Sequence, residues 1–512
     1  MNHQRYSNYS RRSFIKGIGA IAAGGVASTV LPKRALTNEG TPEDDTTFLI
    51  VLTANGGASI IDSFMAIRAS EVEDPDTLNC FPDGVVKNID DTPFRAVDLG
   101  RTSVGQIPAP FEANQSAFVR KHASDITVAT WSRTSVNHFI GQRRSVTGNE
   151  AWLGRTMQEA VALQHGERFA LPNVHLTSGS GFTERGSDSA LPPRVFGEPI
   201  ADPALWPLAL DGTKGLSREV SRSLLQRARR LRNERVDARS DFAKVFEEAP
   251  RIGHWRHIRG GPQERLEAND LISKLLIFPD SERYPLAEHG LASGVSAAAA
   301  RRAFPNYAVD PLEAQAALTY LLLRYRVAST VTLGPNFDVV IDDADVDPSS
   351  GILPPGALLN PPIAFDFSHQ AHRAVQSFMW QRVFDVADRL IDLLKTEPYG
   401  EGGQSLWDRT MIYVATDFGR TKRRPAGAQE FSSGHDLNNG VVVISPLTPG
   451  RTVLGGVDPQ TGLTYGFDRT TGAPEPGVMM SEADIFGGLL QALRVNTSGT
   501  GLNDVRALRR RA

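Results

Sequence analysis

The chain has 512 residues, of which 40% are hydrophobic and 22% are charged, an ordinary globular composition with enough length to bury a substantial core. Its formal net charge of −3 gives no long-range reason to expect a nucleic acid or an anionic membrane as a partner. Cys80 is the sole cysteine, which excludes an internal disulfide bond. Stability must therefore come from packing and from any metal that binds.

Two adjacent arginines stand near the N-terminus, within residues 10–16 (SRRSFIK). The mild apolar run at 17–31 follows them, and its 15 residues are too few to span a bilayer, for which roughly 20 are needed. The pattern predicts a twin-arginine signal over residues 1–37, recognised by the twin-arginine export machinery, and a mature chain that is periplasmic or extracellular. No clean Ala-x-Ala site precedes Thr37. An uncleaved signal that anchors the chain in a membrane, or a buried N-terminal helix, therefore stay as alternatives.

Strand-like and helix-like patterns alternate along the rest of the chain. Continuous apolar, β-rich runs predict buried strands at 46–53 (TTFLIVLT), 125–131 (DITVATW), 327–333 (VASTVTL) and 410–415 (TMIYVA). Apolar residues at helical spacing predict helices at 150–165, 312–325 and 371–394. The alternation predicts an α/β fold with a mostly parallel central sheet and helices on both faces.

Three further segments interrupt this alternation. Residues 178–207 are rich in Pro, Gly and Ser, and the Asp/Pro-rich residues 338–362 predict a long loop of the kind that is more often functional than accidental. Residues 214–302 are rich in Arg, Glu and Leu with helical periodicity, which predicts a helical insertion or cap in an otherwise single domain, 38–512. The amphipathic stretches of this insertion have two possible faces to cover, the protein's own core or a partner.

Short polar motifs stand where apolar runs end. They are residues 55–59 (NGGAS) with Asp62, Asn137-His138, Asp366 with His369 and His372, residues 417–420 (DFGR), and residues 434–436 (GHD). Carboxylates and imidazoles delivered from separate strand ends are how an open α/β sheet assembles a metal site in the crevice beyond its strands. The pattern therefore predicts a hydrolase-like pocket.

At these motifs the chain resembles the secreted bacterial family called domain of unknown function 1501, which belongs to the alkaline phosphatase-like superfamily together with the sulfatases. Members have an apolar strand ending in Gly-Gly-x-Ser-x-x-Asp, an Asn/Ser-His-Phe segment, an Asp-Thr-His element, a Glu-Phe-Gly-Arg-Thr motif and an Asp-His pair. The similar stretches here are 56–62, 137–139, 366–369, 417–421 and 435–436, and residues 406–410 and 481–493 also resemble the family. The similarity spans residues 46–495, with the helical middle as the divergent part.

The resemblance implies a site where Asp and His residues hold two divalent metals against a phosphate or sulfate ester. The implied ligands, position by position, are Asp62, Asp366, His369, Asp417 and His435, and the implied ion is zinc, manganese or calcium. Two departures stand out. Asp417-Phe418 replaces the Asp-His pair of active phosphatases, and His435-Asp436 inverts the usual late Asp-His. With one imidazole missing, a site for one metal or for none is the alternative.

Each implied ligand also has a structural alternative. Asp62 and Asp417 suit turns or caps after their strands, which is a common role for aspartate. His369 and His372 flank the predicted start of a helix, where they could satisfy backbone groups, and His138 could pack beside the pocket without coordinating. Only the joint occurrence of the motifs favours a metal site.

The nucleophile has several candidates. Thr134 and Ser135 follow the strand at 125–131 and precede a predicted helix, where the superfamily places its nucleophile, although either could equally cap the helix. Ser59, on the glycine-rich turn, is the second choice. Arg420 could pair with an anionic substrate or form a structural salt bridge. Residues 80–84 (CFPDG) imitate the sulfatase Cys-x-Pro-x-Arg signal but lack its final Arg, so Cys80 is expected to be a partly buried thiol.

Two classes of function compete on this sequence. The first is an exported metal-dependent hydrolase acting on a small anionic ester of phosphate or sulfate. The second is a binding or assembly protein that keeps the same fold after its chemistry has decayed. Phe418 and the uncertain nucleophile favour the second, whereas the joint presence of the five implied ligands favours the first.

Overall fold

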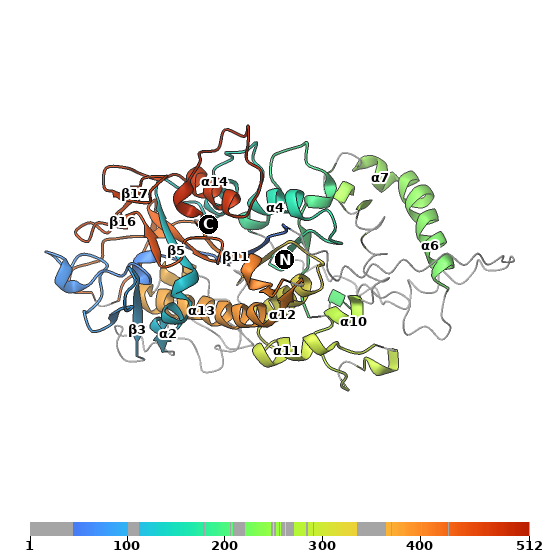
Figure 1. Ribbon diagram of the computed structural model, residues 1–512, viewed down its shortest axis with the longest axis horizontal. Coiled ribbons are helices and arrows are strands. Elements are labelled where there is room, and N and C mark those ends of the chain that lie inside the picture. Colours follow the sequence, from blue (N-terminus) through green and yellow to red (C-terminus); the bar gives the residue numbers. More distant parts are fainter. Residues whose placement is uncertain are drawn as a thin grey trace, which may run out of the picture. The chain divides into compact units, whose positions relative to one another are not determined.

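Eight strands form the central sheet of the computed structural model (Figure 1). In spatial order they are β15 (Thr452–Leu454), β5 (Ile126–Trp131), β14 (Asn439–Ile444), β11 (Thr410–Thr416), β1 (Phe48–Ala54), β8 (Thr330–Leu333), β6 (Asn173–His175) and β7 (Glu198–Pro199). Within this sheet β14 runs antiparallel to its neighbours β11 and β5, and the other pairings are parallel. The protein is therefore an α/β protein with a large, mixed, mostly parallel sheet, which confirms the predicted fold class.

The structure describes residues 45–100, 112–177, 180–204, 206–207, 221–246, 249, 252–254, 256–257, 262, 271–282, 285–289, 291–334, 365–369, 371–400, 402–428 and 430–510. All of them belong to one compact unit, Gly40–Ala512. The predicted export signal at 1–37 and the predicted loop at 338–362 lie outside the described residues, as do parts of 178–207 and 214–302.

Helices cover both faces of the sheet (Figure 1). Along β1 the side chains alternate between two cores, with Phe48, Ile50 and Leu52 in one and Leu49 and Val51 in the other. The helices that complete these cores are α12 (Pro311–Arg324) and α13 (His372–Thr396) for the first, and α4 (Met157–His165) and α14 (Glu482–Ala492) for the second. A strand that is buried on both faces reads as a continuous apolar run, which is why β1 could be predicted from sequence.

The remaining described α-helices are α2 (Gln115–His122), α3 (His138–Thr147), α6 (Arg222–Leu231), α7 (Asp241–Val245), α10 (Leu271–Leu275) and α11 (Val295–Ala303). Of the short 3-10 helices, η9 (Phe365–His369) contributes to the site described below. Smaller sheets are β2 (Val86–Asn88), β3 (Arg95–Leu99) and β4 (Ala113–Asn114); β9 (Pro398–Tyr399) and β10 (Gln404–Ser405); β12 (Gly419–Arg420) and β13 (His435–Asp436); and β16 (Gly456–Val457), β17 (Thr464–Phe467) and β18 (Pro474–Glu475).

The predicted elements agree with the structure except at their ends. The helix predicted at 150–165 begins only at Met157, because Gly154 has a positive φ of 73° and Thr156 caps the helix. The Thr156 side chain accepts a hydrogen bond from the backbone N–H of Glu159, and the Glu159 carboxylate accepts one from the backbone N–H of Thr156. This reciprocal cap fixes the helix start.

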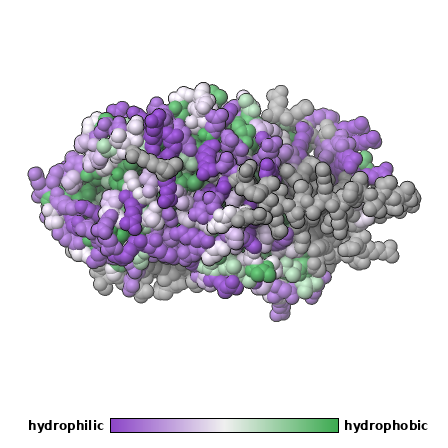
Figure 2. All heavy atoms as spheres, viewed as in Figure 1, coloured by the Kyte–Doolittle hydropathy of each residue, from purple (hydrophilic) through white to green (hydrophobic). Residues whose placement is uncertain are grey.

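Exposed apolar side chains gather in two places. Figure 2 shows a face on which hydrophilic residues predominate and hydrophobic ones form small patches. Fifteen large apolar side chains are exposed among the described residues; three of them flank the start of α3 (Val136, Phe139 and Ile140), and six lie between residues 224 and 246. None of the described helices is long and apolar enough to cross a membrane. The exposure of their side chains places the two groups of apolar residues on the surface.

The strand directions bring the polar motifs together at one edge of the sheet. β1, β11 and β5 are parallel, so their carboxyl ends meet at the same edge, and the antiparallel β14 starts there. The chain leaves β1 through residues 55–57, leaves β11 at Asp417 and enters β14 from β13. All of the polar motifs that follow these strands in sequence are thereby delivered to one edge.

The buried His175 generates a prediction about pH. His175 ends β6, and burial, reinforced by the charge of His254, lowers the pKa of its imidazole from 6.5 to about 4. The folded protein keeps this ring neutral, whereas the unfolded chain takes up a proton below pH 6.5. We therefore expect the free energy of unfolding to fall as the pH decreases from about 6.5 towards 4, by roughly 2 kcal/mol at pH 5.

Urea denaturation of the wild type and of His175→Gln at several pH values measures this effect. The variant lacks the titrating group, so its free energy of unfolding should decline less steeply over the same interval. Equal slopes for the two proteins would show that His175 does not contribute.

Candidate metal centre

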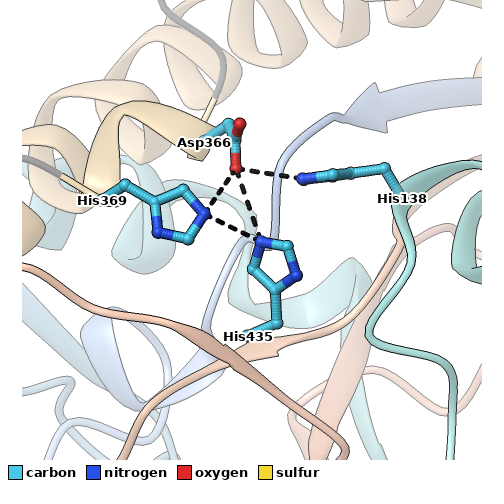
Figure 3. A group of neighbouring side chains, drawn as sticks. All are labelled: His138, Asp366, His369 and His435. Atoms are coloured by element: carbon cyan, nitrogen blue, oxygen red, sulfur yellow. Dashed lines mark hydrogen bonds and ion pairs between the residues drawn. The ribbon is translucent and has the colours of Figure 1, made fainter.

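Four side chains converge on one point at the carboxyl edge of the sheet: His138, Asp366, His369 and His435 (Figure 3). Asp366 Oδ1 lies 3.2 Å from His138 Nε2, 3.3 Å from His369 Nε2 and 3.8 Å from His435 Nε2. His369 Nε2 and His435 Nε2 are 2.9 Å apart. We call these four residues the His/Asp cluster.

The cluster is assembled from three parts of the chain. His138 is the first residue of α3, whose N-cap Asn137 accepts a hydrogen bond from the backbone N–H of Ile140. Asp366 and His369 lie three residues apart on η9, so that one helical turn presents both to the same side. His435 lies on β13, which pairs with β12 directly after β11. Each segment begins or ends next to a strand of the central sheet.

Hydrogen bonds orient two of the imidazoles. His138 Nδ1 lies 2.8 Å from Asp417 Oδ2, and His435 Nδ1 lies 2.5 Å from the backbone oxygen of Val136. Since a carboxylate or carbonyl oxygen accepts, Nδ1 carries the proton in each ring. In the neutral form, each Nε2 then points a lone pair at the centre of the cluster, as in the carboxylate–histidine–metal arrangement of protein metal sites.

The spacing of the donor atoms fits a metal ion. Ligands held about 2.1 Å from a zinc ion in tetrahedral geometry lie about 3.4 Å from one another. The four separations given above run from 2.9 to 3.8 Å and bracket that value, and all four donor atoms lie within 4.8 Å of one another. Three imidazoles with one carboxylate are also a donor set that zinc accepts, whereas calcium prefers six to eight oxygens. The residues present therefore fit a transition metal such as zinc.

The electrostatics of the cluster favour a cation at its centre. Burial by itself lowers the pKa of His138, but its bonds to Asp366 and Asp417 raise that pKa to about 9. Burial by itself raises the pKa of Asp366, and the hydrogen bond of His138 and its other partners hold it well below the usual range. Burial, together with the charge of Arg420, lowers the pKa of His369, which therefore offers a lone pair at neutral pH. A proton on His138 or a metal ion at the centre would each supply the positive charge that the neighbouring carboxylates favour.

Asp417 is not part of the cluster but binds one of its members, His138. Its buried carboxylate accepts hydrogen bonds from the backbone N–H groups of Gly56 (3.2 Å) and Gly57 (2.6 Å) as well as from His138. The turn that supplies these N–H groups has positive φ at both glycines, 93° and 83°. A Cβ at Gly56 would come within 2.2 Å of the Asp366 nitrogen. The glycine turn therefore lets the backbone approach both carboxylates closely.

Arg420 anchors Asp366 from inside the protein. Its guanidinium is fully buried and donates to Asp366 Oδ1 at 2.9 Å. It also donates to three backbone oxygens, those of Gly56 (3.0 Å from Nε), Phe365 (3.2 Å) and Ser433 (3.3 Å). Because no surface of this side chain is exposed, its observed role is structural, which was one of the two roles considered from sequence.

Asp62 lies in a separate buried network. Its Oδ1 is 3.0 Å from His372 Nε2, and His372 Nδ1 is 2.8 Å from Ser433 Oγ. Burial raises the pKa of Asp62, but the charge and hydrogen bond of His372 outweigh it and lower the pKa overall. The Asn79 amide also donates to Asp62, at 3.2 Å. The structure thus brings Asp366, His369 and His435 together and places Asp62 with His372 instead.

The three hydroxyl candidates for a nucleophile are held differently. Thr134 is buried and donates to the backbone oxygen of Asp417 and to the carboxylate of Glu482. Ser59 is fully buried, and its hydroxyl helps to lower the pKa of Asp62. Ser135 is half-buried, and its Oγ accepts the backbone N–H of Asn137 at 3.1 Å. Of the three, Ser135 alone has solvent access.

Aromatic and aliphatic groups line the cluster. The Phe418 ring stacks on the His435 imidazole, with centroids 4.0 Å apart, and tilts against His138 at 4.7 Å. Val136, Phe139 and Ile140, on either side of His138, are exposed. Phe418 therefore fills the space beside the cluster with carbon.

A second group of possible ligands, His122, Asp388 and Asp392, is already occupied by a cation. The ammonium group of Lys121 lies 2.7 Å from a carboxylate oxygen of each aspartate. Cys80, the other reactive group singled out from sequence, is buried, and burial raises the pKa of its thiol.

The position of His138 in the cluster was not predicted from sequence, although the Asn137-His138 motif was singled out. The signal that could have identified it is its place at the first turn of a helix that follows a central strand, beyond a capping asparagine. No protein-family model matches the chain, and none of the curated proteins compared with it is similar to it. The resemblance found in the motifs therefore stays a prediction.

The glycine turn generates a prediction. Gly56→Ala should lower the free energy of unfolding by about 2 kcal/mol or more, because the new methyl group meets the Asp366 backbone at a positive φ. It should also reduce metal binding by displacing Asp366.

Gly427→Ala is the matched control for this change. Gly427 also has a positive φ, 71°, but no other part of the protein lies within 4 Å of the place that its new methyl group would take. Thermal unfolding and metal titration of both variants separate backbone strain from the collision. Equal losses in the two proteins would contradict a special role for the turn at Gly56.

A second prediction concerns Asp417. Asp417→Asn should weaken metal binding by about 10- to 100-fold. The amide is neutral, so it holds the Nδ1–H of His138 less strongly than the negative carboxylate does. Asp436→Asn, on β13 beside His435, is the control and should bind metal as the wild type does. Competition with a chromophoric chelator gives both affinities. Unchanged binding in Asp417→Asn would refute the orienting role.

Proposed function

We propose that the protein is an exported, metal-dependent hydrolase of the alkaline phosphatase-like type, acting on a phosphate or sulfate ester. The observation that carries the proposal is the convergence of three imidazoles and one carboxylate at the carboxyl edge of the sheet, where Asp417 and the Val136 carbonyl bind the Nδ1 atoms of His138 and His435 and leave their Nε2 atoms facing inward. The five motifs shared with domain of unknown function 1501 support it independently.

The proposed centre holds one ion, bound by His138, Asp366, His369 and His435, and zinc suits this donor set best. Such an ion, when bound, supplies positive charge that stabilises the developing charge on an ester and makes a water molecule more acidic. A second ion is not proposed, because Phe418 packs beside the cluster where the resemblance would place a histidine, and Asp62 is engaged by His372 and Asn79.

The residues around the ion have separate tasks. The four ligands are half-buried or exposed, so a small anionic ester can reach the centre from solvent. Asp417 and Arg420, both buried, fix the positions of His138 and Asp366 and do not touch the ester. The exposed Val136, Phe139 and Ile140 offer contact to an uncharged part of the substrate. Water is the proposed nucleophile, with Ser135 as the one accessible hydroxyl to test against it.

Metal analysis is the decisive experiment. The chain purified without chelator should carry one equivalent of zinc, and His138→Ala and His435→Ala should each lose it while remaining folded. His165→Ala, in which the lost histidine contacts the backbone oxygen of Leu493 away from the cluster, is the control and should retain it. Asp62→Asn should also retain one equivalent, although its unfolding free energy should fall.

Hydrolysis of nitrophenyl phosphate and nitrophenyl sulfate then tests the chemistry. We expect kcat/KM to fall by about 100-fold or more in His435→Ala and on chelation, and to be restored by zinc in the wild type only. A Ser135→Ala variant that keeps its activity would support water as the nucleophile. Zinc bound without turnover of either ester class would favour the alternative of a binding protein, and a folded wild type that takes up no metal would refute the centre itself.

A further inference from the structure

The region between residues 221 and 246 combines positive charge with exposed apolar side chains. Its first part, 221–239, carries seven arginines (residues 222, 227, 229, 230, 232, 235 and 239) against two acidic residues, Glu234 and Asp237. The helix α6 spans the start of this region and α7 its end (Figure 1). We call residues 221–246 the arginine-rich segment.

Six apolar side chains of this segment face solvent. Six of the fifteen large exposed apolar residues in the described part of the chain lie here: Leu224, Leu231, Val236, Phe242, Val245 and Phe246. Val236, Phe242 and Val245 are 65%, 58% and 74% exposed. The rings of Phe242 and Phe246 contact each other, with centroids 4.9 Å apart. So many apolar groups on one short segment indicate a surface that is covered when the protein works.

The spacing on α6 places exposed arginines beside exposed leucines. Leu224 and Leu231 are seven residues apart, so they lie on the same face of the helix, two turns from each other. Arg227 and Arg230 are also exposed; Arg227 borders that face, three residues after Leu224 and four before Leu231, and Arg230 lies farther round on the same side. Leucines bordered by arginines are the pattern of a helix that lies in the interface of a membrane.

We propose that the arginine-rich segment binds the surface of an anionic lipid bilayer. Phosphate groups of such lipids would pair with the exposed arginines, Arg227, Arg230, Arg235 and Arg239, while the leucine and phenylalanine side chains enter the boundary between head groups and acyl chains. A nucleic acid would account for the arginines but leave six apolar side chains in water. A second copy of the segment would bring like charges together across the contact. A bilayer satisfies both features at once.

The charge of the whole chain conceals this property. The formal net charge of −3 gave no reason to expect an anionic membrane, because the acidic residues elsewhere outweigh the local excess of arginine. Interfacial binding responds to charge within about one Debye length, roughly 8 Å at physiological salt, so the local excess decides it. The attachment is peripheral and does not depend on the metal centre.

Sedimentation with lipid vesicles tests the proposal on the whole chain. Vesicles of phosphatidylcholine with about 30% phosphatidylglycerol provide the anionic surface, and vesicles of phosphatidylcholine alone report any binding by the apolar run at 17–31 that all variants share. The wild type should bind the anionic vesicles in excess of this background. Arg227→Gln/Arg230→Gln should weaken the excess by about 30-fold, and Leu224→Ser/Leu231→Ser by about tenfold or more.

Two matched controls remove exposed residues of the same types elsewhere. Arg302→Gln/Arg506→Gln and Val295→Ser/Leu463→Ser change exposed sites outside the segment and should bind as the wild type does. Binding to anionic vesicles no better than background, or equal losses in the controls, would overturn the proposal. So would a leucine variant that leaves vesicle binding intact but converts a dimer to a monomer in analytical ultracentrifugation, because the segment would then join two copies of the chain.

Discussion

The candidate centre depends on the hydrogen bonds that the buried guanidinium of Arg420 donates. It donates to the backbone oxygens of Gly56, Phe365 and Ser433 and to the carboxylate of Asp366, and so it connects the turn after β1, the helix η9 and the segment that leads to His435. A buried charge is tolerated only when its hydrogen bonds are satisfied, and removing one partner leaves the rest unpaired. The three segments are therefore held together as one unit.

The cluster has an inner and an outer layer, and the outer layer decides what the inner one can bind. The Asp417 carboxylate accepts hydrogen bonds from two backbone N–H groups and from His138 Nδ1, so that His138 Nε2 faces the centre. The Val136 carbonyl does the same for His435. Neither contact touches the centre, yet together they turn imidazoles that could point either nitrogen inward into donors of defined orientation. The ability of the cluster to hold a cation thus depends on groups outside the set of four candidate ligands.

Sequence patterns predicted the sheet well because β1, β5 and β11 are buried on both faces and read as apolar runs. They also placed Asp366, His369 and His435 at the edge where these strands end. They did not predict that Asp62 pairs with His372 and Asp417 with His138, or that His138 joins the cluster. These contacts join residues that lie hundreds of positions apart in the sequence, so local patterns do not reveal them. Periodicity likewise predicted helices at 214–302 but left open whether their apolar faces meet the core, and only the exposure of Leu224 and Leu231 distinguishes the two.

The pairing of β12 with β13 affects how the surface beside the site can vary. Because His435 pairs with Arg420 across the β12–β13 ribbon, both ends of the loop between them are fixed at the sheet edge. The loop tip at 425–428 is largely exposed, and lengthening a loop whose ends are pinned costs little free energy. Insertions at the tip could therefore be accommodated while His435 and Arg420 stay in register, so this part of the surface could diversify without disturbing the cluster.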